Sequence, residues 1–265
     1  MSKLFIVLIF SFSLKTNALI GGADVLEGDP ISKSIVALQM AERQADGSVR
    51  FYKGSGVLIS QNVVLTAGHN FFYLKDVTAS QAILSVAPTW GGDSHGQKRI
   101  HVESVSLYPG FSQGPLGTQH DLAIVFLVDP VPSEYVPLKI ALSSDEPPAL
   151  GEKGMLLGYG RSSEDPSAPL SDYRLRRISL KVTRWDNNSI VDSQKIWFSN
   201  QNGSIVGGDS GGPVLFKRDN SLKIFGIGLH GRYDTCIDTK TCEPQSAYAN
   251  TTFLANWINS ALNVE

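Results

Sequence analysis

Short apolar runs separated by turn residues dominate the chain from Ile31 onward. Runs such as SIVALQM, GVLISQNVVLTAG, DLAIVFLVD and IFGIGLHG are rich in Val, Ile and Leu, and Gly, Pro, Asn, Asp and Ser stand between them. Runs of this length and composition are typical of β-strands, and their frequency indicates sandwiches or barrels. The 25 glycines suit the many tight turns that such a fold needs. The pattern therefore predicts an all-β protein.

A proline-rich stretch between Asp129 and Gly151 divides the strand pattern into two parts. Its five prolines make it stiff and unsuited to sheet pairing, as expected for a connection between two units. We expect a first barrel at about residues 30–130 and a second at about 145–250.

One amphipathic helix is predicted at the end of the chain, at about residues 252–263. Thr252 can cap it, and apolar residues recur at spacings of three and four, namely Phe253, Leu254, Trp257, Ile258 and Leu262. We expect its apolar face to pack on the second barrel.

The first 18 residues have the pattern of a secretory signal peptide. Lys3 gives a positive start, Leu4 to Leu14 are mostly apolar, and Thr16 and Ala18 are the small residues of a cleavage site. A membrane span needs roughly 20 apolar residues, and this stretch is about half as long. We expect a mature domain at residues 19–265 that is secreted or periplasmic and leaves the membrane once the signal is removed.

The charge and the cysteine content of the chain limit the classes of function that it can have. Charged residues are 18% of the chain, hydrophobic residues are 42% and the net charge is −2, which favours neither disorder nor nucleic-acid binding. In an exported chain, Cys236 and Cys242 are expected to form one local disulfide, with metal binding or free thiols as alternatives. Zinc would need further ligands at a suitable spacing, so no metal and no cofactor are expected.

Three short blocks carry candidate chemistry: LTAGHN with His69, QHDLAIVFL with Asp121, and GGDSGGP with Ser210. A serine is a poor nucleophile until an imidazole takes its proton, and a carboxylate orients that imidazole. The serine block also satisfies the G-x-S-x-G elbow of α/β-hydrolases, but that fold needs a helix after the serine and the order Ser, Asp, His. His230 is the only histidine after Ser210, and the glycines and proline that follow Ser210 open a helix poorly.

The order His, Asp, Ser is that of chymotrypsin-like enzymes, and the chain resembles the trypsin/chymotrypsin-like serine protease family. LIGGAD is similar to the mature N-terminus of that family, GSGVLIS and VVLTAGH to the strands before its histidine, SVSLYPGF and DLAIVFL to the approach to its aspartate, and GGDSGGPV to its serine loop. The resemblance implies two Greek-key antiparallel β-barrels packed around a cleft, with a C-terminal α-helix.

The resemblance also implies catalytic roles for matching residues. His69 would be the general base and then the general acid, Asp121 its orienting carboxylate, and Ser210 the nucleophile. The backbone N–H groups of Gly208 and Ser210 would form the oxyanion hole.

A further pair implied by the family is the mature N-terminus and the acidic residue before the nucleophile. The ammonium of Leu19 would pair with Asp209 and hold the oxyanion loop in its working shape. Relatives usually expose this amine by cutting after a basic residue, whereas Ala18 precedes Leu19 here. We therefore expect signal cleavage alone to activate the protein.

The specificity pocket is aligned by counting from the nucleophile. The residue six before the serine is an aspartate in relatives that cut after Lys or Arg, and here it is Ser204. Leu229, His230 and Gly231 match the substrate strand, and Ser246 would narrow the pocket depth. A neutral pocket that favours apolar P1 residues is expected. The loop at 232–243 leaves open that an aspartate, Asp234 or Asp238, enters the pocket, or that Arg232 attracts acidic substrates.

Several family features are missing. Gly54, Ser55, Asn70 and Val206 stand where animal relatives have cysteines or their neighbours, so two usual disulfides are absent. Leu229 lacks the hydroxyl that usually supports the catalytic aspartate.

The sequence thus predicts a serine endopeptidase that hydrolyses peptide bonds through an acyl-enzyme. Its expected partners are protein or peptide substrates and protein protease inhibitors, with no nucleic acid. The alternative is a non-catalytic protease homologue that acts as a binding module, and activity as an esterase alone is a weaker option. Three N-x-[ST] patterns, at Asn187, Asn202 and Asn250, would matter only in a cell that glycosylates.

Overall fold

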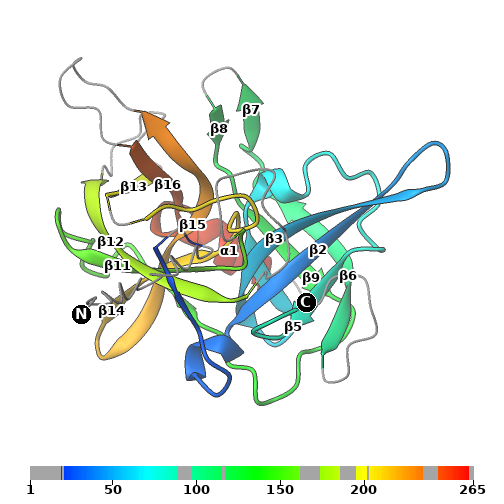
Figure 1. Ribbon diagram of the computed structural model, residues 1–265, viewed down its shortest axis with the longest axis horizontal. Coiled ribbons are helices and arrows are strands. Elements are labelled where there is room, and N and C mark those ends of the chain that lie inside the picture. Colours follow the sequence, from blue (N-terminus) through cyan, green and yellow to red (C-terminus); the bar gives the residue numbers. More distant parts are fainter. Residues whose placement is uncertain are drawn as a thin grey trace, which may run out of the picture.

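Six antiparallel strands close the first barrel in the order β2-β3-β4-β9-β6-β5 (Figure 1). The computed structural model describes residues 19, 21–88, 97–114, 117–161, 174–185, 195–201, 203–234 and 244–262. The strands of this barrel are β2 (Ile35–Arg43), β3 (Val49–Ser60), β4 (Val63–Thr66), β5 (Gln81–Leu84), β6 (Lys98–Leu107) and β9 (Ala123–Leu127). In Figure 1, β2 and β3 continue beyond the barrel as a long hairpin.

Strand β2 shows why the apolar runs in the sequence are continuous and do not alternate with polar residues. Alternate side chains of a strand point to opposite faces. Val36, Leu38 and Met40 fill the first barrel, whereas Ile35 and Ala37 belong to the core between the barrels. Both faces of the strand are therefore buried.

Six further strands close the second barrel, with β12 paired to both β11 and β13. They are β11 (Lys153–Gly158), β12 (Arg176–Trp185), β13 (Lys195–Ser199), β14 (Pro213–Arg218), β15 (Ser221–Asp234) and β16 (Pro244–Asn250). Strand β1 (Ala23–Asp24) adds to β12, and β10 (Lys139–Ile140) runs parallel to β15. The two-barrel fold predicted from the sequence is confirmed.

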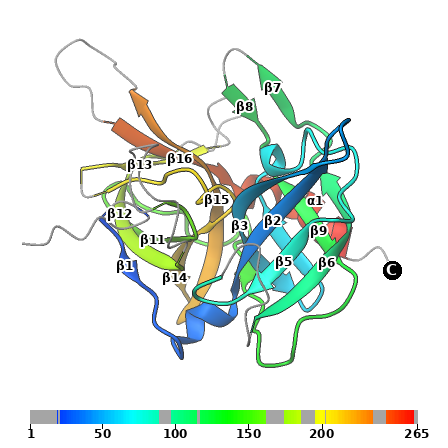
Figure 2. The same cartoon turned by 45° about the vertical axis from the view of Figure 1, so that its right-hand side comes forward.

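Shorter elements lie around the two barrels. Strands β7 (Ser112–Gly114) and β8 (Gly117–Gln119) pair as a separate hairpin, and 3-10 helices η1 and η2 span Pro30–Lys33 and Gly68–Asn70. Figure 2 shows β1 lying alongside the second barrel.

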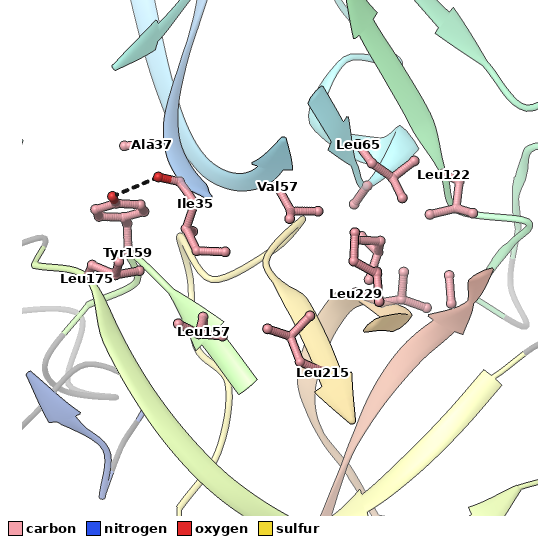
Figure 3. Packing of buried hydrophobic residues seen from close by; sticks show 14 of the residues in the cluster. Ile35, Ala37, Val57, Leu65, Leu122, Leu157, Tyr159, Leu175, Leu215 and Leu229 are labelled. Atoms are coloured by element: carbon pink, nitrogen blue, oxygen red, sulfur yellow. Dashed lines mark hydrogen bonds between the residues drawn. The ribbon is translucent and has the colours of Figure 1, made fainter. Parts of the chain in front are cut away.

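A shared apolar core joins the two barrels. Figure 3 shows Val57 and Leu65 from the first barrel facing Leu215 and Leu229 from the second. The Tyr159 hydroxyl donates to the carbonyl of Ser85 (2.6 Å) and lies 3.3 Å from that of Ile35. These contacts hold the two barrels against each other.

The C-terminal helix α1 (Thr251–Leu262) begins one residue earlier than predicted, and its cap is not Thr252. The Asn250 side chain accepts hydrogen bonds from the Thr252 N–H (3.0 Å) and hydroxyl (2.7 Å). Because Asn250 is fully buried, its N-x-[ST] pattern is inaccessible in the folded chain.

The helix packs on β15 of the second barrel and on the adjoining strand β10, with Ile258 buried. It also reaches beyond that barrel, since Trp257 meets Tyr108, just after β6, edge to face at 5.2 Å between ring centroids. Among the described residues, no helix has the length and apolar character needed to cross a membrane.

Candidate active site

His69 and Asp121 are joined by two hydrogen bonds. Strand β4 ends at Thr66, and the 3-10 helix η2 that follows carries His69, while Asp121 lies two residues before β9. His69 Nδ1 is 2.8 Å from Asp121 Oδ2, and the His69 backbone N–H donates to Oδ1 at 2.8 Å. The Asp121 side chain is fully buried, whereas that of His69 is 20% exposed. This arrangement turns Nε2 away from the carboxylate and allows Asp121 to stabilise an imidazolium.

Ser210 lies in the turn between β13 and β14, and its side chain lines the same groove as that of His69. Its hydroxyl donates to the backbone carbonyl of Leu229 at 2.9 Å. Hydrogen bonds of a catalytic serine are often completed only when substrate binds. The groove thus brings together the nucleophile and the base predicted from the sequence.

The turn around Ser210 presents two backbone N–H groups. Gly208 has φ 101° and Gly211 has φ 89°, values that favour glycine. Within the described residues, the amides of Gly208 and Ser210 donate to no backbone or side-chain acceptor. Donors of this kind, next to a nucleophile, suit a developing oxyanion.

Asp209 points the opposite way, into the second barrel. Its carboxylate accepts from the N–H groups of Gly160 (2.7 Å) and Val206 (2.9 Å), and the backbone N–H of Leu19 is a third donor. Leu19 is itself buried in the core of that barrel. Burial raises the pKa of Asp209 to about 7, although these N–H donors and the charge of Arg176 oppose the shift. The structure therefore brings Leu19 and Asp209 together.

A polar network behind Ser210 was not predicted from the sequence. The Ser55 N–H donates to the Ser210 carbonyl at 2.8 Å, and the Ser55 hydroxyl donates to the Gly208 carbonyl at 2.8 Å. The same hydroxyl oxygen accepts from the Tyr159 N–H at 2.9 Å. The Asn70 amide donates to the Ser210 carbonyl (3.2 Å) and to Thr66 Oγ1 (3.1 Å).

This network occupies the place of a missing disulfide. A Cβ placed on Gly54 would lie 2.8 Å from the Asn70 amide nitrogen, so these two positions face each other. The sequence does show polar residues, Ser55 and Asn70, at these positions. They were interpreted only as the loss of a family disulfide and not as a hydrogen-bond network.

The expected pocket residues are partly described. Ser204 is buried, and Leu229 is 1% exposed, with its side chain in the core between the barrels (Figure 3). His230 and Gly231 lie on β15, and Ser246 lies on the paired strand β16. The side chains of His230 and Ser246 lie outside the described part of the structure, as do Cys236, Cys242, Asp238, Asn187 and Asn202.

Comparison with known proteins agrees with this geometry. The trypsin family model matches residues 33–258. The chain is 24% identical over 228 residues to serine protease filzig of Drosophila melanogaster, across 80% of this chain and 13% of that protein. It is 27% identical over 169 residues to glucanase inhibitor protein 4 of Phytophthora infestans, across 62% of each. The chain thus spans less than two thirds of both relatives. It belongs to the trypsin family of serine proteases.

Proposed function

We propose that this protein is a serine endopeptidase that acts through Ser210, His69 and Asp121. The observation that carries the proposal is the buried Asp121 carboxylate bonded to both the ring and the backbone of His69, in a groove shared with Ser210.

In the proposed reaction, His69 Nε2 takes the Ser210 proton as Oγ attacks the scissile carbonyl carbon. The carbonyl oxygen gains the negative charge and receives hydrogen bonds from the Gly208 and Ser210 amides. The imidazolium, stabilised by Asp121, then gives its proton to the leaving amine as the C–N bond breaks. Water attacks the acyl-enzyme in the same way, which releases the carboxylic acid and restores Ser210.

A binding module remains the second candidate function. The relative whose name describes a glucanase inhibitor favours it, because that name refers to inhibition of another enzyme. The retained residues His69, Asp121 and Ser210 favour catalysis instead, since a binding surface would not require all three.

A fluorophosphonate probe separates the two candidates. We expect it to label the mature chain starting at Leu19 and a Ser104→Ala control, which removes an exposed serine of β6, but not Ser210→Ala. Hydrolysis of a protein substrate should fall by several orders of magnitude in Ser210→Ala. A folded but unlabelled wild-type protein would support the binding module. Labelling without peptide hydrolysis would indicate an esterase.

We further propose an apolar P1 preference. Ser204 supplies no charge at its buried position, and a buried cation without a carboxylate partner costs several kcal/mol. A peptide library varied at P1 should show cleavage after Leu, Met, Phe or Tyr, and Ser204→Asp should shift cleavage toward Lys and Arg. Wild-type cleavage after Arg or Lys would contradict this alignment of the pocket.

A further inference from the structure

A groove of about 550 Å³ extends from Ser210 along the long β2–β3 hairpin. Its walls come from the hairpin, from the segment that begins in η2, and from the nucleophile. The lining residues are Met40, Glu42, Gln44, Arg50, Tyr52, Lys53, His69, Asn70, Tyr73, Leu74 and Ser210.

The groove lies on the leaving-group side of the proposed site. In the proposed reaction, His69 gives its proton to the leaving amine, so the chain after the scissile bond must pass beside this imidazole. The groove contains His69, whereas the expected P1 residues Ser204 and Leu229 are not part of its lining. Substrate residues that follow the scissile bond would therefore occupy it.

The outer part of the groove has balanced charges. The Tyr52 hydroxyl donates to the Glu42 carboxylate at 2.9 Å. Arg50 lies beside both groups, and its pKa is raised mainly by Tyr52 and further by the charge of Glu42. The single anion of the lining is thus matched by a neighbouring cation.

The inner part of the groove carries Lys53. Lys53 is two residues before Ser55 on β3, so its side chain lies on the Ser55 face of the strand, opposite to the side chains of Arg50 and Tyr52. Ser55 is bonded to the Ser210 turn, so Lys53 borders the groove at its end beside this turn. Arg161 reaches this turn from the second barrel. Its N–H donates to the Gly207 carbonyl at 3.0 Å, and its Nε would lie 3.7 Å from a Cβ placed on Gly207.

The two cations act on each other. The pKa of Lys53 is lowered to about 8, mainly by burial and also by the positive charge of Arg161. A substrate carboxylate near both groups would offset this repulsion.

We propose that Lys53, assisted by Arg161, selects substrates with an acidic side chain at the first or second position after the scissile bond. The selection rests on the proposed peptidase function. It concerns a carboxylate carried by a peptide, recognised at the inner end of the β2–β3 groove.

Paired peptides test the selection. Each pair keeps one P1 residue and differs only by Glu or Gln at one of these two positions. We expect the wild-type kcat/KM to favour Glu by about two- to fivefold, as for a partly exposed ion pair, and added salt should reduce the ratio. In Lys53→Met, which keeps an apolar stem, the ratio should approach one. Lys98→Met, at an exposed lysine of β6, should keep the wild-type ratio.

The outcomes distinguish a failure of the proposed selection by Lys53 from a failure of the proposed peptidase function. If wild type cleaves neither peptide of any pair, the peptidase proposal fails. If wild type cleaves both members but Lys53→Met retains the same Glu-to-Gln ratio, the selection by Lys53 is wrong. Should Lys53→Met not fold, Arg161→Gln provides the second test, and it should also lower the ratio.

Discussion

At the scale of single residues, the hydroxyl of Ser55 connects the two halves of the site. It bridges the carbonyl of Gly208 and the N–H of Tyr159, while Asn70 joins the segment of His69 to the carbonyl of Ser210. Hydrogen bonds thus hold the segments that carry Ser55 and Asn70 against the turn of Gly208 and Ser210. Because no thiol takes part, reducing agents should leave this link intact.

Replacing Ser55 by alanine should therefore impair both stability and turnover. The Gly208 carbonyl and the Tyr159 N–H would lose their partner, and a buried polar group left without one costs about 1–3 kcal/mol. The turn of Gly208 and Ser210, which we propose binds the oxyanion, would be held less firmly, so we expect kcat to fall by about tenfold or more with a smaller change in KM. Urea unfolding and steady-state kinetics measure the two effects.

Ser60→Ala is a matched control on the same strand, because among the described residues its hydroxyl bonds only to the nearby exposed Asn62. If Ser55→Ala behaved like Ser60→Ala in both measurements, the positioning role of Ser55 would be wrong.

At the scale of elements, the strands and both barrels were predictable because the information is local. Most barrel strands show as apolar runs, and runs such as β2 are long because both of their faces are buried. Strand β16, with the sequence PQSAYAN, is a barrel strand that has no such run. The helix was predicted from its periodicity, but its first residue was not. Strand β16 pairs as far as Asn250, opposite Gly226. The helix starts at the next residue, so the cap falls on the last residue of the strand.

The candidate site was predictable only where a local motif marks a residue. His69, Asp121 and Ser210 each stand in a recognisable block. Ser55 has no such block, and it is 153 residues from Gly208, its hydrogen-bond partner. The placement of Lys53 near Arg161 likewise depends on how the two barrels pack. Contacts between distant segments therefore account for what the sequence did not show.

At the scale of the whole molecule, the site depends on the packing of one barrel against the other. His69 and Asp121 come from the first barrel, whereas Ser210 comes from the second. The shared apolar core and the Tyr159 hydroxyl fix the relative position of the barrels. Small changes in this core should alter the distance between Ser210 and His69 without touching either residue.

The N-terminal segment reaches the same second barrel and links chain cleavage to stability. In the uncut chain, Leu19 offers only a peptide N–H to the buried Asp209, whose pKa is raised to about 7. A carboxyl group with a raised folded pKa contributes stability that is fully present below its unfolded pKa, near ~3.9. That stability is lost as the pH rises through the folded pKa near 7. The uncut chain should therefore become less stable over this pH range.

We propose that the protein is exported and that cleavage after Ala18 places an ammonium at the same point. The new charge should lower the Asp209 pKa and raise that of the amine above its reference of ~7.7–8.0. The stability that the charged amine contributes is then fully present below the unfolded pKa of the amine. This stability is lost as the pH rises through the folded pKa of the amine.

A chain starting at Leu19 and a chain with two extra N-terminal residues test this link to cleavage. Their difference in Tm should widen from pH 4 to 7, shrink above pH ~8, and largely disappear when both carry Asp209→Asn. Only the chain starting at Leu19 should hydrolyse peptides at full rate, because the Asp209 pair holds the turn that carries Gly208. Equal activity of the two chains, with a Tm difference that does not vary with pH, would contradict the pairing.

Mass spectrometry of the exported protein adds an independent check, since an active form that begins well upstream of Leu19 would exclude activation by signal cleavage.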